Sequence, residues 1–256
     1  MPKRDRYPLG APCWADILTT DVQRAREFYG RVLSWTATEP DEELGGYVQF
    51  LKDGVPVAGC IVNQSAGAVP DMWNAYFCSA DAGATLVRAT ELGGRVILPS
   101  TTVGNLGTMG VIIGPDGAAT GVWAPRDFHG FGLYHERGAA SWFELRTSNY
   151  GDAVAFYREL FEWKTSVSDD GPGPPYTTVV CGGEAVAGIM DAASSLGEKG
   201  VPHWSVYFGV ADVDDAMATI VEQGGRVLRP AQDTAYGRLA MAADPGGTQF
   251  RLMSCD

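Results

Sequence analysis

The sequence has little positive charge and no close pair of cysteines. It carries 19 lysine and arginine residues against 31 aspartate and glutamate residues, a net charge of −12 over 256 residues. No basic stripe is present that could neutralise phosphates, so neither nucleic acid nor an anionic membrane surface is an expected partner. The 5 cysteines are odd in number and widely spaced. This pattern indicates reduced thiols in a cytoplasmic protein, with no disulfide framework and no zinc motif.

Several other signals are missing as well. No apolar run approaches the roughly 20 residues that a membrane-spanning helix needs. The basic start at residues 1–6 has no apolar segment behind it, so we expect no signal peptide. The chain also lacks a nucleotide-binding loop, a nucleophile elbow and a Ser-His-Asp or Cys-His pattern. Because short motifs assign no reaction, the internal repeats carry most of the information.

Four tryptophans mark a repeated unit. Each one opens a short apolar run that reaches an Asp or Asn seven or eight residues later, and a stretch with helical spacing follows. The tryptophans are Trp14, Trp73, Trp142 and Trp204, and the expected helix caps are Asp21, Asp81, Asn149 and Asp212. Each unit reads as a strand, a helix and three further strands. The acidic loop at 39–43 in the first unit is predicted to be a solvated surface.

The units pair first with third and second with fourth. At an offset of 128, Trp14, Thr19, Ala25, Phe28, Tyr29 and Trp35 recur as Trp142, Thr147, Ala153, Phe156, Tyr157 and Trp163. At an offset of 131, Trp73, Tyr76, Phe77 and residues 93–96 recur as Trp204, Tyr207, Phe208 and residues 224–227. A hydrophobic content of 45% suits two modest domains. We predict a loose N-terminal arm at 1–11, a first domain at 12–125, a linker at 126–139 and a second domain at 140–256.

This arrangement resembles two tandem domains of the vicinal oxygen chelate superfamily. The residues that carry the resemblance are Asp21, Phe28-Tyr29 and Leu33-Ser34-Trp35, their counterparts Asn149, Phe156-Tyr157 and Phe161-Glu162-Trp163, then Asp212 with Gly224-Gly225, and the turns 114–117 and 244–247. The superfamily includes glyoxalase I, extradiol dioxygenases and bleomycin-type resistance proteins, and the chain is most similar to its two-domain actinobacterial-type members. The resemblance implies an α+β fold in which each domain pairs two βαβββ units into an open, cup-shaped mixed sheet with helices outside.

Metal-dependent members of that superfamily place His, Gln or Glu at four inward positions. Carried over by position, these fall on Trp14, Asn74, Gly121 and the run around Gly59 in the first domain, and on Trp142, Ser205, Arg251 and the run around Gly188 in the second. An indole N–H cannot coordinate a metal, and a divalent ion needs several converging donors. We therefore expect no metal and no other cofactor. The alternative is a divalent metal held by a displaced ligand set that includes Asp16 or Glu144.

Strand alternation and the resemblance together predict which side chains face the two cups. The ligand-binding candidates are Trp14, Asn74, Tyr76, Trp142, Arg146, Tyr176, His203, Ser205, Tyr207 and Arg251, while Trp73 and Trp204 are expected under the helices. Asp16 and Glu144 are the catalytic candidates, since a buried carboxylate must find a partner or take up a proton. The loop at 170–175 is a candidate flap over the second cup.

Three functions remain open. The first is metal-independent binding, or cofactor-free conversion, of a hydrophobic aromatic small molecule such as an antibiotic or a biosynthetic intermediate, in resistance or secondary metabolism. The second is a divalent-metal enzyme of glyoxalase, hydroxylase, dioxygenase or lyase type. The third is a scaffold whose cups are filled by their own side chains, with the tryptophans as core and Glu144 satisfied by Arg146. We expect a monomer or homodimer, with the more demanding ligand chemistry in the second domain.

Overall fold

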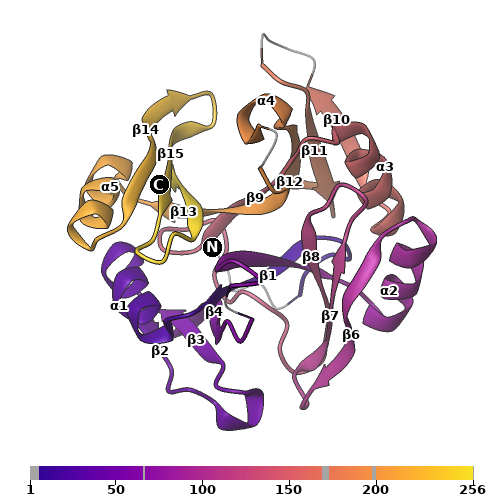
Figure 1. Cartoon of the computed structure of the whole chain (residues 1–256), viewed down its shortest axis with the longest axis horizontal. Coiled ribbons are helices and arrows are strands. Elements are labelled where there is room, and N and C mark those ends of the chain that lie inside the picture. Colours follow the sequence, from indigo (N-terminus) through magenta and orange to yellow (C-terminus); the bar gives the residue numbers. More distant parts are fainter. Residues whose placement is uncertain (1–5, 66, 169–172, 198–199, 256) are drawn as a thin grey trace.

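The computed structural model describes residues 6–65, 67–168, 173–197 and 200–255. It contains two eight-stranded mixed sheets, one in each half of the chain (Figure 1). The strand order is β2-β3-β4-β1-β5-β8-β7-β6 in the first sheet and β10-β11-β12-β9-β13-β16-β15-β14 in the second. This equivalence confirms the predicted tandem α+β fold. The predicted flap at 170–175 lies partly outside the described residues.

The first domain is built from two βαβββ units, as the repeat predicts. Its elements are β1 (Pro12–Thr19), α1 (Val22–Leu33), β2 (Thr36–Ala37), the short 3-10 helix η1 (Glu42–Leu44), β3 (Val48–Lys52), β4 (Val55–Val62), β5 (Met72–Cys78), α2 (Ala82–Glu91), β6 (Arg95–Val103), β7 (Gly107–Ile113) and β8 (Ala119–Pro125). The two first strands, β1 and β5, pair antiparallel in the middle of the sheet.

The second domain repeats this order with one additional short helix. Its elements are β9 (Ala140–Thr147), α3 (Tyr150–Leu160), β10 (Lys164–Ser168), β11 (Tyr176–Cys181), β12 (Glu184–Asp191), α4 (Ala193–Leu196), β13 (His203–Val210), α5 (Val213–Glu222), β14 (Arg226–Thr234), β15 (Gly237–Ala243) and β16 (Gln249–Ser254). None of the helices in the described part of the chain combines the length and apolar composition needed to cross a bilayer.

Four residues were predicted to cap the main helices, and three of them do so. Asp21, Asp81 and Asp212 each accept a hydrogen bond from a backbone N–H in the first turn of α1, α2 and α5. Asn149 precedes α3 but makes no such bond. Its side-chain amide instead donates to Asp152, a residue of the first turn.

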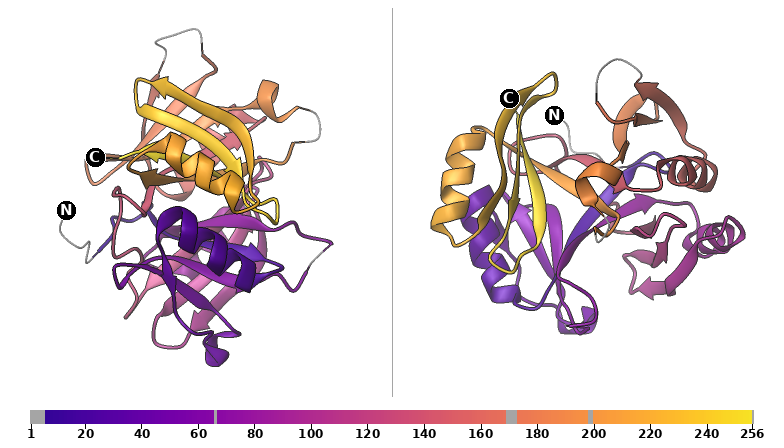
Figure 2. Two further views of the ribbon diagram at one scale, coloured as in Figure 1. Left: turned by 90° about the vertical axis from the view of Figure 1, so that its left-hand side faces the viewer. Right: turned by 45° about the horizontal axis from the view of Figure 1, so that its top comes forward.

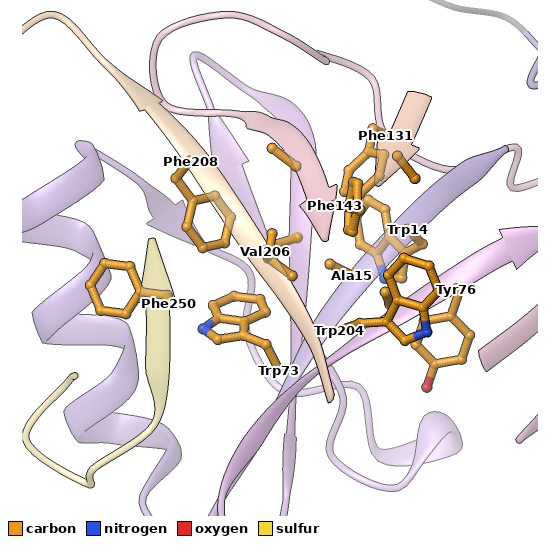
Figure 3. Close-up of a cluster of buried hydrophobic side chains, with 14 of the residues drawn as sticks. Trp14, Ala15, Trp73, Tyr76, Phe131, Phe143, Trp204, Val206, Phe208 and Phe250 are labelled. Carbon is orange, nitrogen blue, oxygen red and sulfur yellow. The ribbon is translucent and has the colours of Figure 1, made fainter. Parts of the chain in front are cut away.

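The two domains pack through the helix-bearing faces of their sheets, and the cups open away from each other (Figures 1 and 2). Helix α1 packs against α5 and α2 packs against α3, so each helix pair joins the two domains. Between the sheets lies an aromatic core in which the ring centroids of Trp73 and Phe208 are 5.0 Å apart (Figure 3). The ring centroids of Trp204 and Phe77 are 4.7 Å apart. Trp73 and Trp204 therefore hold the domains together.

Two buried tyrosines link the domains by hydrogen bonds. Tyr29 accepts from Trp73 Nε1 at 3.0 Å and donates to Asp244 of the other domain at 3.2 Å. At the matching corner, the Tyr157 hydroxyl lies 2.8 Å from Thr120 Oγ1 of the first domain. Asp116 is buried beside Tyr157, and burial raises the pKa of this carboxyl to about 6.

The N-terminal arm differs from expectation over residues 7–11. The prediction of a loose arm is wrong there, because the Tyr7 hydroxyl donates to the Phe131 carbonyl at 3.0 Å and Trp163 Nε1 donates to the Gly10 carbonyl at 2.8 Å. Phe131 of the interdomain segment is only 1% exposed and packs against Trp14. The arm is thus tied to the interdomain segment and to the second domain, and Phe128 of the same segment lines the first cup.

Candidate functional site

The first cup contains a cavity of about 610 Å³, a size suited to a small organic ligand. Its apolar wall comes from both halves of the sheet and from the interdomain segment. The aromatic members are Trp14, Tyr47, Tyr76, Trp123 and Phe128, and the aliphatic members are Leu44, Ile61, Val103, Leu106 and Met109. The cavity therefore offers several flat or flexible apolar surfaces around one space.

Trp14 is fixed in this wall by contacts on both sides. Its Nε1 donates to the Tyr47 hydroxyl at 2.7 Å, and the Phe128 ring meets it edge-on at 4.8 Å between centroids. The Tyr47 hydroxyl lies directly over Gly59, where a Cβ atom would overlap it. The glycine is required by this close approach, and the resulting Trp–Tyr pair is held rigidly.

Asp16 is the one buried carboxyl among the residues that line this cavity, with 5% of its surface exposed. Burial raises its pKa to about 6, while hydrogen bonds from Asn74, Tyr76 and Tyr47 oppose the rise. Asn74 Nδ2 donates to Oδ1 at 3.1 Å, which leaves the carboxylate able to accept further hydrogen bonds. Above about pH 6 the cavity floor therefore carries a negative charge.

An acidic segment forms the rim of the same cavity. Glu39, Asp41 and Glu43 line it from the turn around η1, and no lysine or arginine is among the described lining residues. The segment is exposed, as predicted, but it is also a wall of the cavity. Together with Asp16 it makes the first cup attractive to cations.

The second cup repeats the aromatic pair of the first. Trp142 Nε1 donates to the Tyr176 hydroxyl at 3.0 Å, and that hydroxyl lies over Gly188, where a Cβ atom would overlap it. Burial and the charge of Glu144 raise the pKa of Tyr176, so its hydroxyl keeps its proton. The duplicated domains therefore conserve a Trp–Tyr–Gly stack at equivalent strand positions.

The charged groups of the second cup differ from those of the first. Arg146 Nη1 donates to Glu144 Oε1 at 2.9 Å, and both residues are buried. The same guanidinium donates to Met190 Sδ at 3.0 Å and to Ser195 Oγ of α4 at 2.7 Å. Glu144 is thus satisfied by Arg146, which is the structural alternative anticipated for it.

A second arginine lies near this ion pair. The Arg251 Cζ atom lies over the Tyr207 ring at 5.3 Å from its centroid, within range of a cation–π contact. Arg251 is 7% exposed, and its Nε and Nη2 atoms are buried without a hydrogen-bond partner among the described residues. His203 Nδ1 lies 2.8 Å from the Val201 carbonyl. Burial lowers the pKa of His203, and the nearby arginines lower it further.

The predicted site residues therefore fall into two separate groups. Trp14, Asp16, Asn74 and Tyr76 meet in the first cup, and Trp142, Glu144, Arg146, Tyr176, His203, Ser205, Tyr207 and Arg251 belong to the strands of the second. Tyr47 was missed, although the repeat contains the signal. It follows a glycine pair just as Tyr176 follows a proline pair, at an offset of 129.

Leu106, Met109 and Trp123 were also missed. They come from β7, β8 and the turn before them, and the fold alone brings them to the cavity. No local pattern in the sequence distinguishes these residues from ordinary strand residues.

The side chains do not fit the metal site of metal-dependent relatives. Trp14 directs its only nitrogen, a protonated donor, to Tyr47, and the Tyr76 ring fills the space above Gly121. At the matching position of the second cup stands the cationic Arg251. Within the described residues, no group of three or more His, Cys, Asp or Glu side chains is placed to hold a metal ion. A displaced set would start from the one buried carboxylate of each cup, Asp16 or Glu144, which supplies too few donors for a divalent ion.

Comparison with known proteins identifies the family. The model of the Glyoxalase/Bleomycin resistance protein/Dioxygenase superfamily matches residues 139–252. CFP32 of Mycobacterium tuberculosis (strain CDC 1551 / Oshkosh), whose name assigns it provisionally to the glyoxylases, is 34% identical over 260 residues, covering 99% of this chain and 98% of that protein. The chain belongs to this superfamily. The anthracycline biosynthesis protein DnrV of Streptomyces peucetius is also 34% identical, over 265 residues covering 97% and 94%.

Solved structures agree on the fold. The Mn(II)-bound glyoxalase from Novosphingobium aromaticivorans has a TM-score of 0.67 at 16% identity, covering 96% of this chain and 82% of that one. The 2,3-dioxygenase LapB from Pseudomonas sp. KL28 has a TM-score of 0.65 at 16% identity, covering 97% and 93%. At such identities the similarity shows the shared fold alone.

Proposed function

We propose that the first cup binds a planar aromatic small molecule without a bound metal. The observation that carries the proposal is the cavity itself, whose apolar wall combines aromatic with aliphatic side chains and whose floor holds one buried carboxyl, Asp16. Each aromatic pair formed with a ligand contributes on the order of 0.5–1.5 kcal/mol beyond simple burial. A rigid indole such as Trp14 makes such a contact at little entropic cost.

The charge of the cup narrows the ligand class. Asp16 lies at the floor and three further carboxylates lie at the rim, of which Glu39 pairs with Arg26 at 3.7 Å; no lysine or arginine is among the described lining residues. An ammonium group on the ligand would provide the donor that a buried carboxylate requires. We therefore assign the cup to an aromatic molecule that carries a basic amine.

The similarity to DnrV supports a role in secondary metabolism, because that relative is named for anthracycline biosynthesis. A protein of this kind would hold an antibiotic or a biosynthetic intermediate. Metal analysis of protein purified without chelators tests the metal-free part of the proposal. Stoichiometric zinc, iron or manganese held by side chains of either cup would contradict it.

Three probes of similar shape test the ligand class. We expect 9-(aminomethyl)anthracene to bind more tightly than 9-anthracenemethanol, and 9-anthracenecarboxylate to bind most weakly to the first cup. Tryptophan fluorescence quenching reports binding, with and without EDTA. Equal affinities for the three probes, or no saturable binding of the amine, would contradict the assignment.

Two variants locate the binding. Asp16→Asn keeps the size of the side chain, and we expect it to bring the amine to the affinity of the alcohol. Trp14→Phe retains an aromatic core residue but loses indole stacking and the bond to Tyr47. The matched control is Trp142→Phe in the other cup, which should leave amine binding unchanged.

A cofactor-free conversion at the same cup is the second candidate, favoured by the raised pKa of Asp16. A buried carboxyl with a pKa of about 6 is suited to act as a general base near neutral pH. Deuterium exchange into the methyl group of 9-acetylanthracene, followed by NMR, tests this. Catalysed exchange should rise through pH 6 and disappear in Asp16→Asn; exchange that persists in that variant argues against Asp16 as the base.

A further inference from the structure

The second cup holds more buried positive charge than its own side chains neutralise. Arg146 and Arg251 are 5% and 7% exposed, and the buried carboxylate Glu144, at 6%, pairs with Arg146. Glu144 is committed to Arg146. Because burial and the neighbouring arginines lower the pKa of His203, that ring is neutral at physiological pH. Among the buried side chains of the described residues, one unit of positive charge therefore remains in this cup, and it resides on Arg251.

Two of the three guanidinium nitrogens of Arg251 have lost their water without gaining a hydrogen bond to the described residues. Its Nε and Nη2 atoms are buried and have no acceptor among the described residues. The Tyr207 ring lies against the guanidinium plane, but a ring face does not replace the acceptors that N–H groups require. A buried, unpaired charge is costly, so a side chain of this kind is retained where an external anion completes it.

The fold does not require an arginine at this position. In the first domain the equivalent residue is Gly121, which pairs with Tyr76 as Arg251 pairs with Tyr207. There the Tyr76 ring occupies the space that a side chain would take. The two equivalent sheets thus have glycine at this position in the first domain and arginine in the second. Folding of the sheet therefore does not depend on an arginine at position 251.

We propose that the second cup is an anion-binding site in which Arg251 receives the carboxylate of a small aromatic acid. A guanidinium presents its N–H groups as a planar fork that matches a carboxylate, and Nε with one Nη forms such a fork. Trp142 and Tyr207 supply aromatic surface beside it. This site is separate from the amine-binding cup, so the two assignments stand or fall independently.

The test uses 2-naphthoate and its neutral isostere 2-naphthamide, measured by calorimetry on the full chain. We expect one saturable naphthoate site, at least tenfold weaker binding of the amide, and at least tenfold weaker naphthoate binding in Arg251→Gln. Arg251→Lys should fall between, because it keeps the charge but loses the fork. Arg158→Gln, which removes an exposed arginine from the outer helix α3, is the matched control and should bind naphthoate as the unmodified protein does. Absence of saturable naphthoate binding, or equal binding by Arg251→Gln, overturns the proposal.

Further measurements test the proposal even if Arg251→Gln fails to fold. In the unmodified protein, naphthoate should shift the NMR signal of the Arg251 Nε–H group, and inorganic phosphate should compete only weakly. Arg251→Met should melt no lower than the unmodified protein in the absence of ligand, since it removes an uncompensated charge. An unmoved Nε–H signal, tighter binding of phosphate, or a large loss of thermal stability in Arg251→Met would each assign Arg251 another role.

Discussion

The two cups share their aromatic geometry and differ in their charge. Both hold a Trp–Tyr pair seated on a glycine, with Trp14, Tyr47 and Gly59 in one and Trp142, Tyr176 and Gly188 in the other. Around this common stack the first cup has only carboxylates, whereas the second has two arginines for its one glutamate. The two domains therefore share the aromatic residues that pack on the strands, and they differ in the charged side chains that a ligand would contact.

Loss of the buried carboxylate should lower the stability of the protein in the second cup but not in the first. Glu144→Gln leaves Arg146 and Arg251 buried without a counter-charge, so we expect a loss of about 3–5 kcal/mol in the free energy of unfolding. Urea denaturation at pH 7.5 measures it. The double variant Glu144→Gln with Arg146→Met should recover part of the loss, and a loss below about 1 kcal/mol would show that water already screens the pair.

The equivalent change in the first cup should have the opposite sign. The pKa of Asp16 is raised from 3.8 to about 6, so its contribution to stability is present below pH 4 and is lost as the pH rises through 6. Asp16→Asn should therefore raise the free energy of unfolding at pH 7.5 by about 1–3 kcal/mol and leave it nearly unchanged at pH 4.

Denaturation of the unmodified protein and of Asp16→Asn at several pH values between 4 and 8 checks this. The difference between their free energies of unfolding at each pH gives the contribution of Asp16. Asp116, whose pKa is also about 6, contributes to the pH dependence that remains in the variant. A difference between the two proteins that does not change with pH would be inconsistent with a raised pKa at Asp16.

The paired positions Gly121 and Arg251 should respond differently to alanine. A Cβ atom at Gly121 would overlap the Tyr76 ring, so Gly121→Ala should cost about 1–3 kcal/mol and weaken binding of an aromatic amine. Arg251→Ala should cost less, because the arginine makes no hydrogen bond with the described residues through its buried Nε and Nη2. Thermal melting of the two variants side by side measures the difference, and equal losses would weaken the contrast.

Substitutions in the Trp–Tyr pairs that both cups share should change the free energy of unfolding least, and by similar amounts in the two cups. Tyr47→Phe removes the acceptor of Trp14 Nε1, and we expect a loss of about 1–2 kcal/mol because that indole is buried. Tyr176→Phe should cost below about 1 kcal/mol, since the half-buried Trp142 can turn its N–H to water. Chemical denaturation at pH 7.5 resolves the two, and the reverse order would contradict the difference in burial.

Much of the fold could be predicted because strand alternation, helix caps and helical spacing are local sequence patterns. The strand and helix pattern and three of the four caps follow from spacing within each unit, and the equivalence of the halves follows from comparing units at offsets of 128 and 131. The arm at residues 7–11 was predicted wrongly, because its anchors are distant. Tyr7 reaches Phe131 and Gly10 receives Trp163, contacts that no local pattern encodes.

The sequence by itself determined which side chains alternate toward each cup, since strand periodicity and duplication place Trp14, Asp16, Trp142 and Glu144 at equivalent positions. Only the tertiary structure decided whether each carboxylate, Asp16 or Glu144, has a charged partner. Whether a carboxylate is paired with an arginine, as Glu144 is, or is hydrogen-bonded by neutral side chains alone, as Asp16 is, depends on neighbours from other strands and on burial. Both are properties of the assembled sheet, because the free energy of a buried charge is set by what surrounds it in space.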